Sequence, residues 1–403
     1  MTLPDIDIGL SEEDLAVRET CHKFAIDVLR PAGRELDRLE DPARVIARDS
    51  ILWDVFRQYR ELGLGALFGD TEMDPLAKAR MMCVINEELS WGDVGLTISL
   101  GLSHFHQPWI EQSGDAALRE RFCNPERPTI GCWALTEPDH GSDTVALTEP
   151  CFTDPKLRPN CIARKDGEHY VINGQKAAWV SNGSIADIAV LFCTLDPAQG
   201  FSGGAVILVP LDAPGVERPR PLDKIGQRSL NQGQMFFSDV RVPASHLVVG
   251  PDFYPMALEG MLCHANAGMS QLFVGVARAA LDHAMEYAEQ RVQGGLPISR
   301  HQSVRARLFR MFMKVEAARA LTRRTALYFA VNPPSIQHAI AAKVFATDTA
   351  FEVASQAVQI FGGNGLSREY PVEKLLRDAR ASMIEDGCNE MLGLIAGARI
   401  QGH

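Results

Sequence analysis

Glu385 and Asp386 form an adjacent pair of acids near the end of the chain, and Gly387 follows them. A carboxylate that is kept away from water has a raised pKa and can act as a general base. An arbitrary acidic pair after a helix is more often a solvated surface feature. The pair therefore becomes a candidate catalytic site only if other segments of the chain bring a ligand to it.

A second candidate is the segment 132–143, with the sequence CWALTEPDHGSD. It reads as an apolar strand that runs into a turn rich in hydroxyl, carboxylate and glycine groups. In such a turn backbone N–H groups can face a ligand, and Gly141 lacks the side chain that would block the approach. Taken alone, the segment is more typical of an ordinary surface turn capped by serine and aspartate.

A third candidate is the segment 359–366, QIFGGNGL, which follows a long helical pattern. Glycines that tolerate positive φ could form only the C-cap of that helix. They could also let the backbone approach a phosphate, with Gln359 donating a hydrogen bond. A lone glycine cluster does not decide between these two interpretations.

Three regions with different residue patterns must position these segments. Helical spacing begins at Ser11, which is followed by acids, and Pro31 is expected to stop the first helix. Between 128 and 250, apolar β-branched runs alternate with Gly, Pro and Asp turns, which predicts a small β-barrel or β-sandwich. Helical spacing returns from about Tyr254 and predicts a four-helix bundle.

The expected fold class is α+β, with a helical N-terminal domain at 1–127, a middle β-domain at 128–250 and a C-terminal helical bundle at 251–403. The length of 403 residues and the 46% hydrophobic content are enough for a large buried core and for two or three domains.

Composition argues against several functional classes. The formal net charge is -11 and the charges are interspersed, so a nucleic-acid partner is not expected. The N-terminus does not resemble a signal peptide and no apolar run could span a bilayer, so neither export nor a membrane partner is expected. The nine cysteines are scattered without a C-x-x-C pattern, which favours a reducing cytoplasm and no disulfide framework or metal site.

Segments 134–144 and 359–378 together resemble the two signature patterns of the acyl-CoA dehydrogenase family. They read ALTEPDHGSDT and QIFGGNGLxxExxxxKxxxD. The resemblance extends over nearly the whole chain through the strand 167–183, the turn 223–229 and the strand end 236–243. It implies helical, β and helical domains that enclose FAD, in subunits that assemble as a tetramer or dimer.

The resemblance also assigns residues to the ligands. The residues that it places around the flavin are Trp133, Leu135, Thr136, Gly141, Ser142, Trp179 and Ser181. The residues that it places on the rest of FAD, with the diphosphate held largely across a subunit boundary, are Arg291, Gln293, Gln302, Gln359, Gly362, Gly363, Cys388 and Glu390. Those assigned to the substrate are Ser142, Asn266 and Gly387. FAD binding and oligomerisation would then be coupled.

The implied reaction removes a proton beside a thioester carbonyl and passes a hydride from the neighbouring carbon to the flavin, with an electron-transfer flavoprotein as the usual acceptor. Asp386 falls where the family carries its catalytic glutamate, and Glu385 is the alternative base. Aspartate is shorter by one methylene, about 1.5 Å, and a misplacement near that size can cost about a hundredfold in rate. Other relatives carry the base on a helix where this chain has Ala265.

Three further departures from the family pattern bear on the site. Asn266 stands where many relatives carry an arginine beside the CoA-binding face. Ala177 and Ala178 stand where most relatives have one residue, which predicts a bulge at the flavin edge. The connection 148–161 is longer than usual and is expected to form a surface loop or lid.

Other functions stay open at this point. Residues 386–389 also resemble nitroalkane oxidases, which use an aspartate base and deliver electrons to oxygen, although their arginine seven residues after the base is Gly393 here. A dehydrogenase that takes an acyl group on a carrier protein is a second alternative, suggested by Asn266. A flavoprotein that has lost catalysis and serves as a scaffold is a third.

Overall fold

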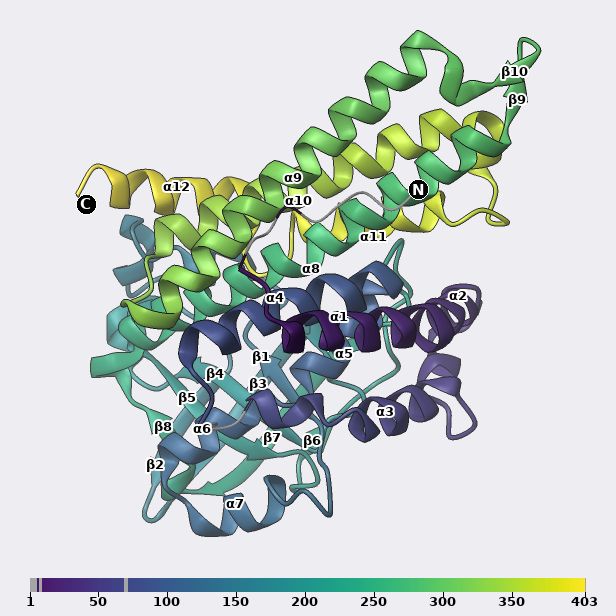
Figure 1. The fold of residues 1–403 in the computed structure, drawn as a ribbon. Coiled ribbons are helices and arrows are strands. Elements are labelled where there is room, and N and C mark those ends of the chain that lie inside the picture. Colours follow the sequence, from purple (N-terminus) through teal and green to yellow (C-terminus); the bar gives the residue numbers. More distant parts are fainter. Residues whose placement is uncertain (1–5, 7–8, 69–71, 403) are drawn as a thin grey trace.

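The computed structural model describes residues 6, 9–68 and 72–402, which form helices, then a β-sheet, then a bundle of long helices (Figure 1). This order confirms the predicted α+β class. The N-terminal α-helices are α1 (Glu12–Phe24), α2 (Arg30–Asp37), α3 (Ile51–Glu61), α4 (Pro75–Gly92), α5 (Val94–Leu102), α6 (His106–Ser113) and α7 (Ala116–Phe122).

The start of α1 follows the sequence signal at Ser11. The Ser11 hydroxyl accepts a hydrogen bond from the backbone N–H of Asp14 at 3.1 Å, and the Asp14 carboxylate accepts one from the Ser11 N–H at 2.8 Å. This reciprocal cap satisfies N–H groups that have no partner within the helix.

The prediction that Pro31 stops the first helix is wrong. α1 continues through a π-helical segment, Ala25–Leu29, and Pro31 lies in the first turn of α2. Proline is tolerated in a first helical turn, because its missing N–H is one that needs no partner there. The wider hydrogen-bond register of the preceding segment therefore lets the chain remain helical.

The β-strands form one eight-stranded sheet in the order β6-β7-β3-β2-β4-β5-β8, with β1 parallel to β4. The strands are β1 (Gly131–Ala134), β2 (Ile162–Asp166), β3 (His169–Ser181), β4 (Ile188–Thr194), β5 (Gly204–Pro210), β6 (Val216–Glu217), β7 (Gln232–Pro243) and β8 (Leu247–Val249). β4 and β5 are buried at every position, which explains why their sequences are continuous apolar runs.

A bulge interrupts β3 where the sequence predicted one. Lys176 pairs with Met235 on β7, and the next pair is Val180 with Gly233, so residues 177–179 lie opposite Gln234. The extra residues leave the Trp179 side chain 59% exposed instead of packed in the sheet. The bulge therefore presents an indole ring on one side of the β-domain.

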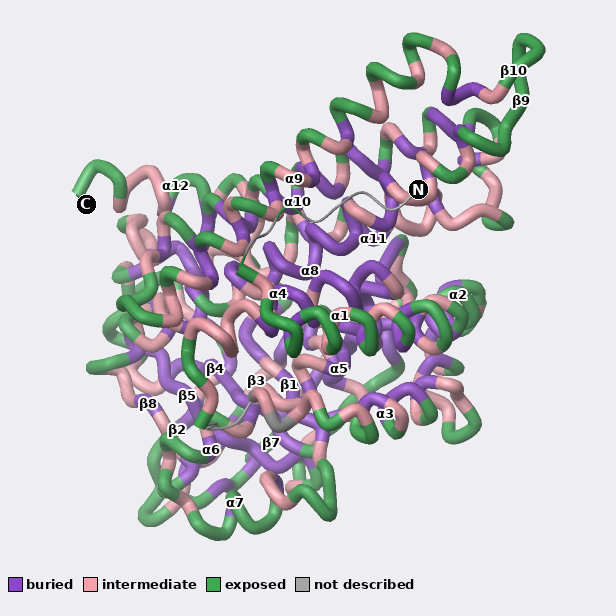
Figure 2. The backbone as a smooth tube through the Cα atoms, in the orientation of Figure 1, coloured by how far each residue is buried: buried purple, intermediate pink, exposed green. Residues whose placement is uncertain are grey.

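The C-terminal part is built on four long or medium helices with a fifth added at the end. They are α8 (Tyr254–Gln290), α9 (Gln302–Val331), α10 (Ile336–Phe361), α11 (Val372–Ser382) and α12 (Asn389–Ile400), and a short hairpin of β9 (Val292–Gln293) and β10 (Leu296–Pro297) joins α8 to α9. α8 packs between α4 and α10 and is buried along much of its length (Figure 2). None of the described helices is long and apolar enough to cross a membrane.

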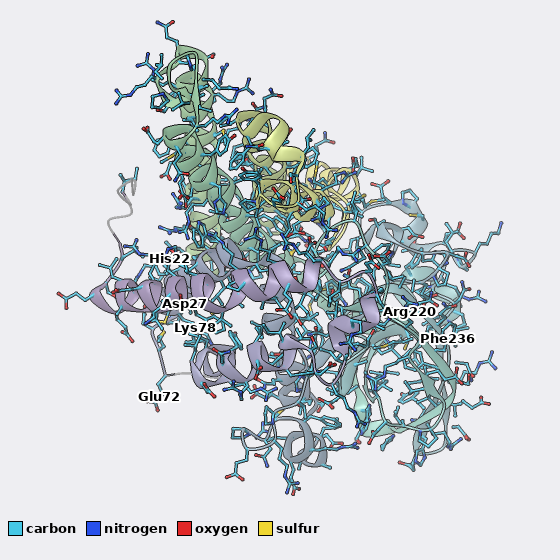
Figure 3. All side chains as sticks on the ribbon, turned by 90° about the vertical axis from the view of Figure 1, so that its right-hand side faces the viewer. His22, Asp27, Glu72, Lys78, Arg220 and Phe236 are labelled. Carbon is cyan, nitrogen blue, oxygen red and sulfur yellow. The ribbon has the colours of Figure 1, made fainter. Side chains whose placement is uncertain are left out.

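Polar contacts join the N-terminal helices to the other parts. The His22 ring on α1 lies 2.8 Å from the Glu88 carboxylate on α4, which also pairs with Arg278 on α8. At the other side, Arg220, which is labelled on the β-domain in Figure 3, donates to Asp41 at 2.7 Å. The three parts therefore pack as one body around α4 and α8.

A buried ion pair fixes the turn after β1 against β3. The Lys176 ammonium lies 2.7 Å from Glu137 and donates to the carbonyl of Leu135 at 2.8 Å, and both charged side chains have no exposed surface. Glu137 also accepts from the N–H groups of Asn160 and Cys161. A buried charge pair with its remaining hydrogen bonds satisfied specifies geometry, because neither partner tolerates loss of the other.

We expect Lys176→Met to lower the free energy of unfolding by about 3 to 5 kcal/mol, because it leaves Glu137 charged and unpaired in the interior. Urea denaturation of the purified protein measures this. Lys165→Met, at an exposed position of β2, is the control and should change stability by no more than about 0.5 kcal/mol. A loss of similar size in both variants contradicts the structural role given to the pair.

Candidate active site

Asp386 lies in the connection between α11 and α12 in a left-handed backbone conformation. Its φ is +52°, and Gly387 follows at +92°. Aspartate adopts such angles more readily than most residues, yet they still cost free energy and need support from the surroundings. The turn is closed by the Asn389 N–H, which donates to the carbonyl of Met383 at 3.0 Å.

Lys343 on α10 fixes this turn through hydrogen bonds. Its side chain has no exposed surface, and the ammonium donates to the carbonyl of Gly387 at 3.0 Å and to the Asn389 side chain at 2.7 Å. Asn389 in turn donates to Thr347 and Asp348 on the same helix. The acidic turn is therefore fixed to α10 by a buried cation.

The first glycine-containing segment meets the acidic turn directly. The backbone N–H of Cys388 donates to the hydroxyl of Ser142 at 3.0 Å. A side chain at Gly387 would come within 3.0 Å of Leu392 and 3.5 Å of Val145, so the backbone packs closely there. The structure thus brings Ser142, Gly387 and Cys388 together beside Asp386, although they come from opposite ends of the chain.

Burial raises the pKa of Asp386 to about 6, against the lowering effect of the Lys343 ammonium. Burial is also the main cause that raises the pKa of Glu385 to about 7. Both residues keep some exposed surface, so the acidic turn is partly buried and not fully enclosed. Within the described residues, the Asp386 carboxylate makes no ion pair or side-chain hydrogen bond, which leaves it free to accept a proton.

Glu385 is connected to the β-domain through a polar chain. The amide of Gln227 donates to Glu385 at 2.9 Å, and the Lys224 ammonium donates to the Gln227 carbonyl at 3.0 Å and to the Gln232 side chain at 2.8 Å. Gln232 then donates to the hydroxyl of Ser181 at 2.9 Å. Burial lowers the pKa of Lys224 to about 8. The chain joins the acidic turn to the strand that carries the bulge.

Sequence reasoning missed four residues of this arrangement, namely Lys343, Lys224, Gln227 and Gln232. Three of them lie in or just after the turn 223–229, which served only as a landmark of the family resemblance. A buried lysine gives no periodic signal, because its helical neighbours set the pattern. The available signal was the lysine itself, at a position of α10 where the helical period predicts an apolar residue.

The residues assigned to the flavin ring gather on one wall. The segment after β1 is tied to the bulge because the N–H of Ala177 donates to the carbonyl of Thr136 at 2.9 Å. Leu135 is buried, Thr136 and Ser181 are partly exposed, and Trp133 stacks on Phe105 with ring centroids 5.8 Å apart. These residues lie on neighbouring segments, here named the flavin wall, and their contact with a flavin stays a prediction.

Several features of this wall fit a bound flavin. The Trp179 ring is exposed without a covering side chain, and the buried Nε1 of Trp133 has no acceptor among the described residues. A side chain at Gly141 would meet no atom within 4 Å, so space is open above that turn. An exposed indole, an unpaired N–H donor and an open glycine suit a planar heteroaromatic ligand.

A second group of assigned residues lies elsewhere. Arg291, Gln293, Gln302, Gln359, Gly362 and Gly363 are all exposed and gather where α8, the β9–β10 hairpin and the end of α10 meet, at the end of the bundle far from the sheet (Figure 1). Tyr287 stacks on Phe361 at 4.0 Å and accepts from Asn364 at 3.0 Å, which holds this end together. One chain therefore does not bring this group to the flavin wall.

Two assigned residues are placed less favourably for direct ligand contact. Asn266 on α8 has no exposed surface, donates to the carbonyl of Leu262 at 2.9 Å, and has a side-chain oxygen without a partner in the described ranges. Glu390 is exposed on α12. Because Asn266 has no exposed surface, its role in substrate binding stays a prediction.

The connection 148–161 is held against the β-domain. It contains a short 3-10 helix, Pro150–Thr153, whose Phe152 stacks on Phe201 with ring centroids 6.3 Å apart. The prediction of a surface loop missed this buried aromatic contact, and a role as a lid stays untested.

Comparisons with known proteins agree with this arrangement over the whole chain. The acyl-CoA dehydrogenase N-terminal, middle and C-terminal domain models match residues 11–125, 132–240 and 257–401. The chain is 34% identical over 403 residues to the short-chain specific acyl-CoA dehydrogenase of Megasphaera elsdenii, covering 98% of this chain and 100% of that protein. It is 30% identical over 406 residues to the mitochondrial short-chain specific enzyme of Mus musculus, covering 98% and 91%.

Solved structures give the same result. Butyryl-CoA dehydrogenase from Megasphaera elsdenii superposes with a TM-score of 0.83 at 29% identity, covering 98% of this chain and 100% of that one. Glutaryl-coenzyme A dehydrogenase in its glutaryl-CoA complex superposes with a TM-score of 0.85 at 25% identity, covering 98% and 97%. The chain therefore belongs to the acyl-CoA dehydrogenase family, whose members are FAD-dependent oxidoreductases that act on CH–CH groups.

Proposed function

We propose that this chain oxidises an acyl-CoA thioester to the α,β-unsaturated product, with Asp386 as the base that takes the α-proton. The observation that carries the proposal is the Asp386 carboxyl, which has a raised pKa, no partner of its own in the described structure, and a turn fixed against Ser142. Bound FAD would supply the acceptor for the hydride of the β-carbon. The flavin wall of Trp133, Thr136 and Trp179 lies on the segments joined to that turn.

The shorter side chain of Asp386 requires a precisely held backbone. Aspartate has about 1.5 Å less reach than glutamate, so the turn must carry the carboxyl closer to the substrate. Lys343 and Ser142 fix the peptide unit that joins Gly387 to Cys388, at its carbonyl and at its N–H. Holding the base within a narrow range of positions is what makes proton transfer from carbon efficient.

Lys343 also sets the charge of the base. Its ammonium favours the ionised form of Asp386 and opposes the effect of burial on the pKa of that carboxyl. A base with a pKa near 6 is mostly ionised at neutral pH and still binds a proton appreciably. We infer that Lys343 keeps Asp386 ready to act without neutralising it through a direct ion pair.

We further infer that a second copy of the chain completes the cofactor site. The exposed group at the far end of the bundle, Arg291, Gln293, Gln302, Gln359, Gly362 and Gly363, offers guanidinium, amide and backbone N–H donors that suit a diphosphate. It is too far from the flavin wall in one chain to bind the same cofactor. A dimer or tetramer that brings one subunit's group to its neighbour's wall resolves this.

The electron acceptor that we propose is an electron-transfer flavoprotein. A solved chain from a study of the electron transferring flavoprotein of Acidaminococcus fermentans superposes with a TM-score of 0.84 at 27% identity. Two alternatives are tested together with the acceptor: direct transfer to oxygen, as in nitroalkane oxidases, and use of a carrier-protein thioester, which Asn266 suggests. Anaerobic flavin reduction by CoA and carrier thioesters, followed by admission of oxygen, distinguishes them.

Asp386→Asn should retain FAD but reduce the flavin about 10² to 10⁴ times more slowly than the wild type, because asparagine cannot take the proton. Anaerobic stopped-flow bleaching of the flavin by short acyl-CoA thioesters measures this. Glu385→Gln is the matched comparison at the neighbouring position. If Glu385→Gln loses bleaching and Asp386→Asn keeps it, the base is Glu385.

The rate of flavin reduction should rise with pH through about 6, because the base works only when it is ionised and burial raises the pKa of Asp386 to about 6. Lys343→Met removes the cation that lowers this pKa, so the profile should move to higher pH, by on the order of one unit. Lys314→Met, at a partly exposed ion pair on α9, should leave the profile in place. A profile that moves to lower pH in Lys343→Met contradicts the role given to that ammonium.

A further inference from the structure

Glu385 occupies an unusual position for an acid that is not the base. It adjoins Asp386 in the same turn, and burial raises the pKa of both carboxyl groups. Its side chain makes no ion pair within the described part of the chain, and its hydrogen-bond partner is the neutral amide of Gln227, at 2.9 Å. A buried carboxylate without a cation in contact is costly, so the charge state of Glu385 needs an explanation.

The Gln227 amide supplies the second observation. Its Nε2 donates to Glu385, but its Oε1 is buried and has no hydrogen-bond donor among the described residues. The Nε2 of Gln227 also donates to the carbonyl of Asp378 at 3.4 Å, so two acceptors orient the amide. A proton on the neighbouring Glu385 carboxyl would supply the donor that this buried acceptor lacks.

The described cations near Glu385 and Asp386 direct their donors to other acceptors, so none forms an ion pair with Glu385. Lys224 directs its ammonium to the carbonyls of Gln227 and Leu230 and to Gln232. Lys343 donates to the carbonyl of Gly387 and to the side chain of Asn389. Asp378 on α11 adds negative charge but pairs with Lys374 at 2.6 Å, and Arg228 bonds Asp223 and the carbonyls of Asp37, Leu39 and Lys224.

We propose that Glu385 is a positioning residue that stays protonated while Asp386 is ionised, paired through both its oxygens with the Gln227 amide. The acidic turn then holds one negative charge, on the residue that takes the α-proton. Two ionised carboxylates side by side would repel each other and would oppose the negative charge that develops on the thioester as the proton leaves. Asp386 takes the substrate proton, and Glu385 keeps its own.

The electrostatics of the turn agree with this assignment. Burial raises the pKa of both carboxyl groups, and the charge of Asp386 raises the pKa of Glu385 further, while Lys224 and Lys343 act in the opposite direction. An ionised Asp386 therefore favours the protonated form of Glu385. The charge state of Glu385 is a property of the free enzyme, whereas its effect on catalysis rests on the proposed function.

The direct test is infrared difference spectroscopy of the FAD-bound enzyme, which detects the C=O stretch of protonated carboxyl groups. Between pH values of about 6 and about 7, the wild type should retain a protonated-carboxyl band that Glu385→Gln lacks. Glu385→Gln is isosteric with the acid, and its FAD content reports correct folding. A wild-type band that does not change on this substitution overturns the proposal, whatever the enzyme's substrate.

The kinetic test uses the pH profile of anaerobic flavin reduction. If Glu385 is neutral when Asp386 ionises, Glu385→Gln should move the apparent pKa of the base by less than about half a unit. If Glu385 is ionised at that point, removing its charge should lower the apparent pKa by about one unit or more, which overturns the proposal. Glu352→Gln, which removes an acid from the exposed side of α10, is the control for a general charge effect. Absence of flavin reduction in the wild type would count against the proposed function but leave the infrared result valid.

Discussion

The buried ammonium of Lys343 is the constraint on which the candidate site depends. A cation without exposed surface must have its donors satisfied, and here the acceptors are the carbonyl of Gly387 and the side chain of Asn389. Satisfying Lys343 therefore fixes the turn between α11 and α12 and places Asp386 at a left-handed backbone angle. Burial raises the pKa of the Asp386 carboxyl, and the same cation opposes this effect without an ion pair.

The turn is also held by the β-domain, which makes the site a joint product of two parts of the chain. Ser142 accepts the Cys388 N–H, and Gln227 contacts Glu385. The buried pair of Glu137 and Lys176 fixes the segment that carries Ser142 against the strand with the bulge. Movement of the sheet relative to the bundle would separate the base from the flavin wall, so the buried charges at this junction preserve catalytic geometry as well as stability.

Sequence patterns predicted what depends on local spacing and on long family motifs. The Ser11 cap, the order of helices and strands, and the bulge after Lys176 are set by residues close together in the chain, and all are found. Pro31 was misjudged because a π-helical segment just before it moved proline into a first turn, where it is harmless. The role of Lys343 could not be predicted, because its partners lie more than forty positions away and are specified only by the packed fold.

The base that we propose is an aspartate, which has less reach than a glutamate, and the structure gives this short side chain a physical basis. A carboxyl with less reach demands a turn with less freedom, and the contacts of Lys343, Ser142 and Gln227 restrict that turn from three directions. The neighbouring Glu385 adds a second carboxyl group beside the proposed base, and its protonation state changes the net charge of the acidic turn.

The central claim, that Asp386 takes the α-proton, is tested most directly by hydrogen exchange without net oxidation. With the flavin reduced beforehand and a saturated acyl-CoA in deuterated buffer, hydride transfer is blocked and only proton removal is observed. The wild type should exchange the α-hydrogens, as followed by NMR, and Asp386→Asn should not. Exchange at an unchanged rate in Asp386→Asn would contradict the assignment of the base.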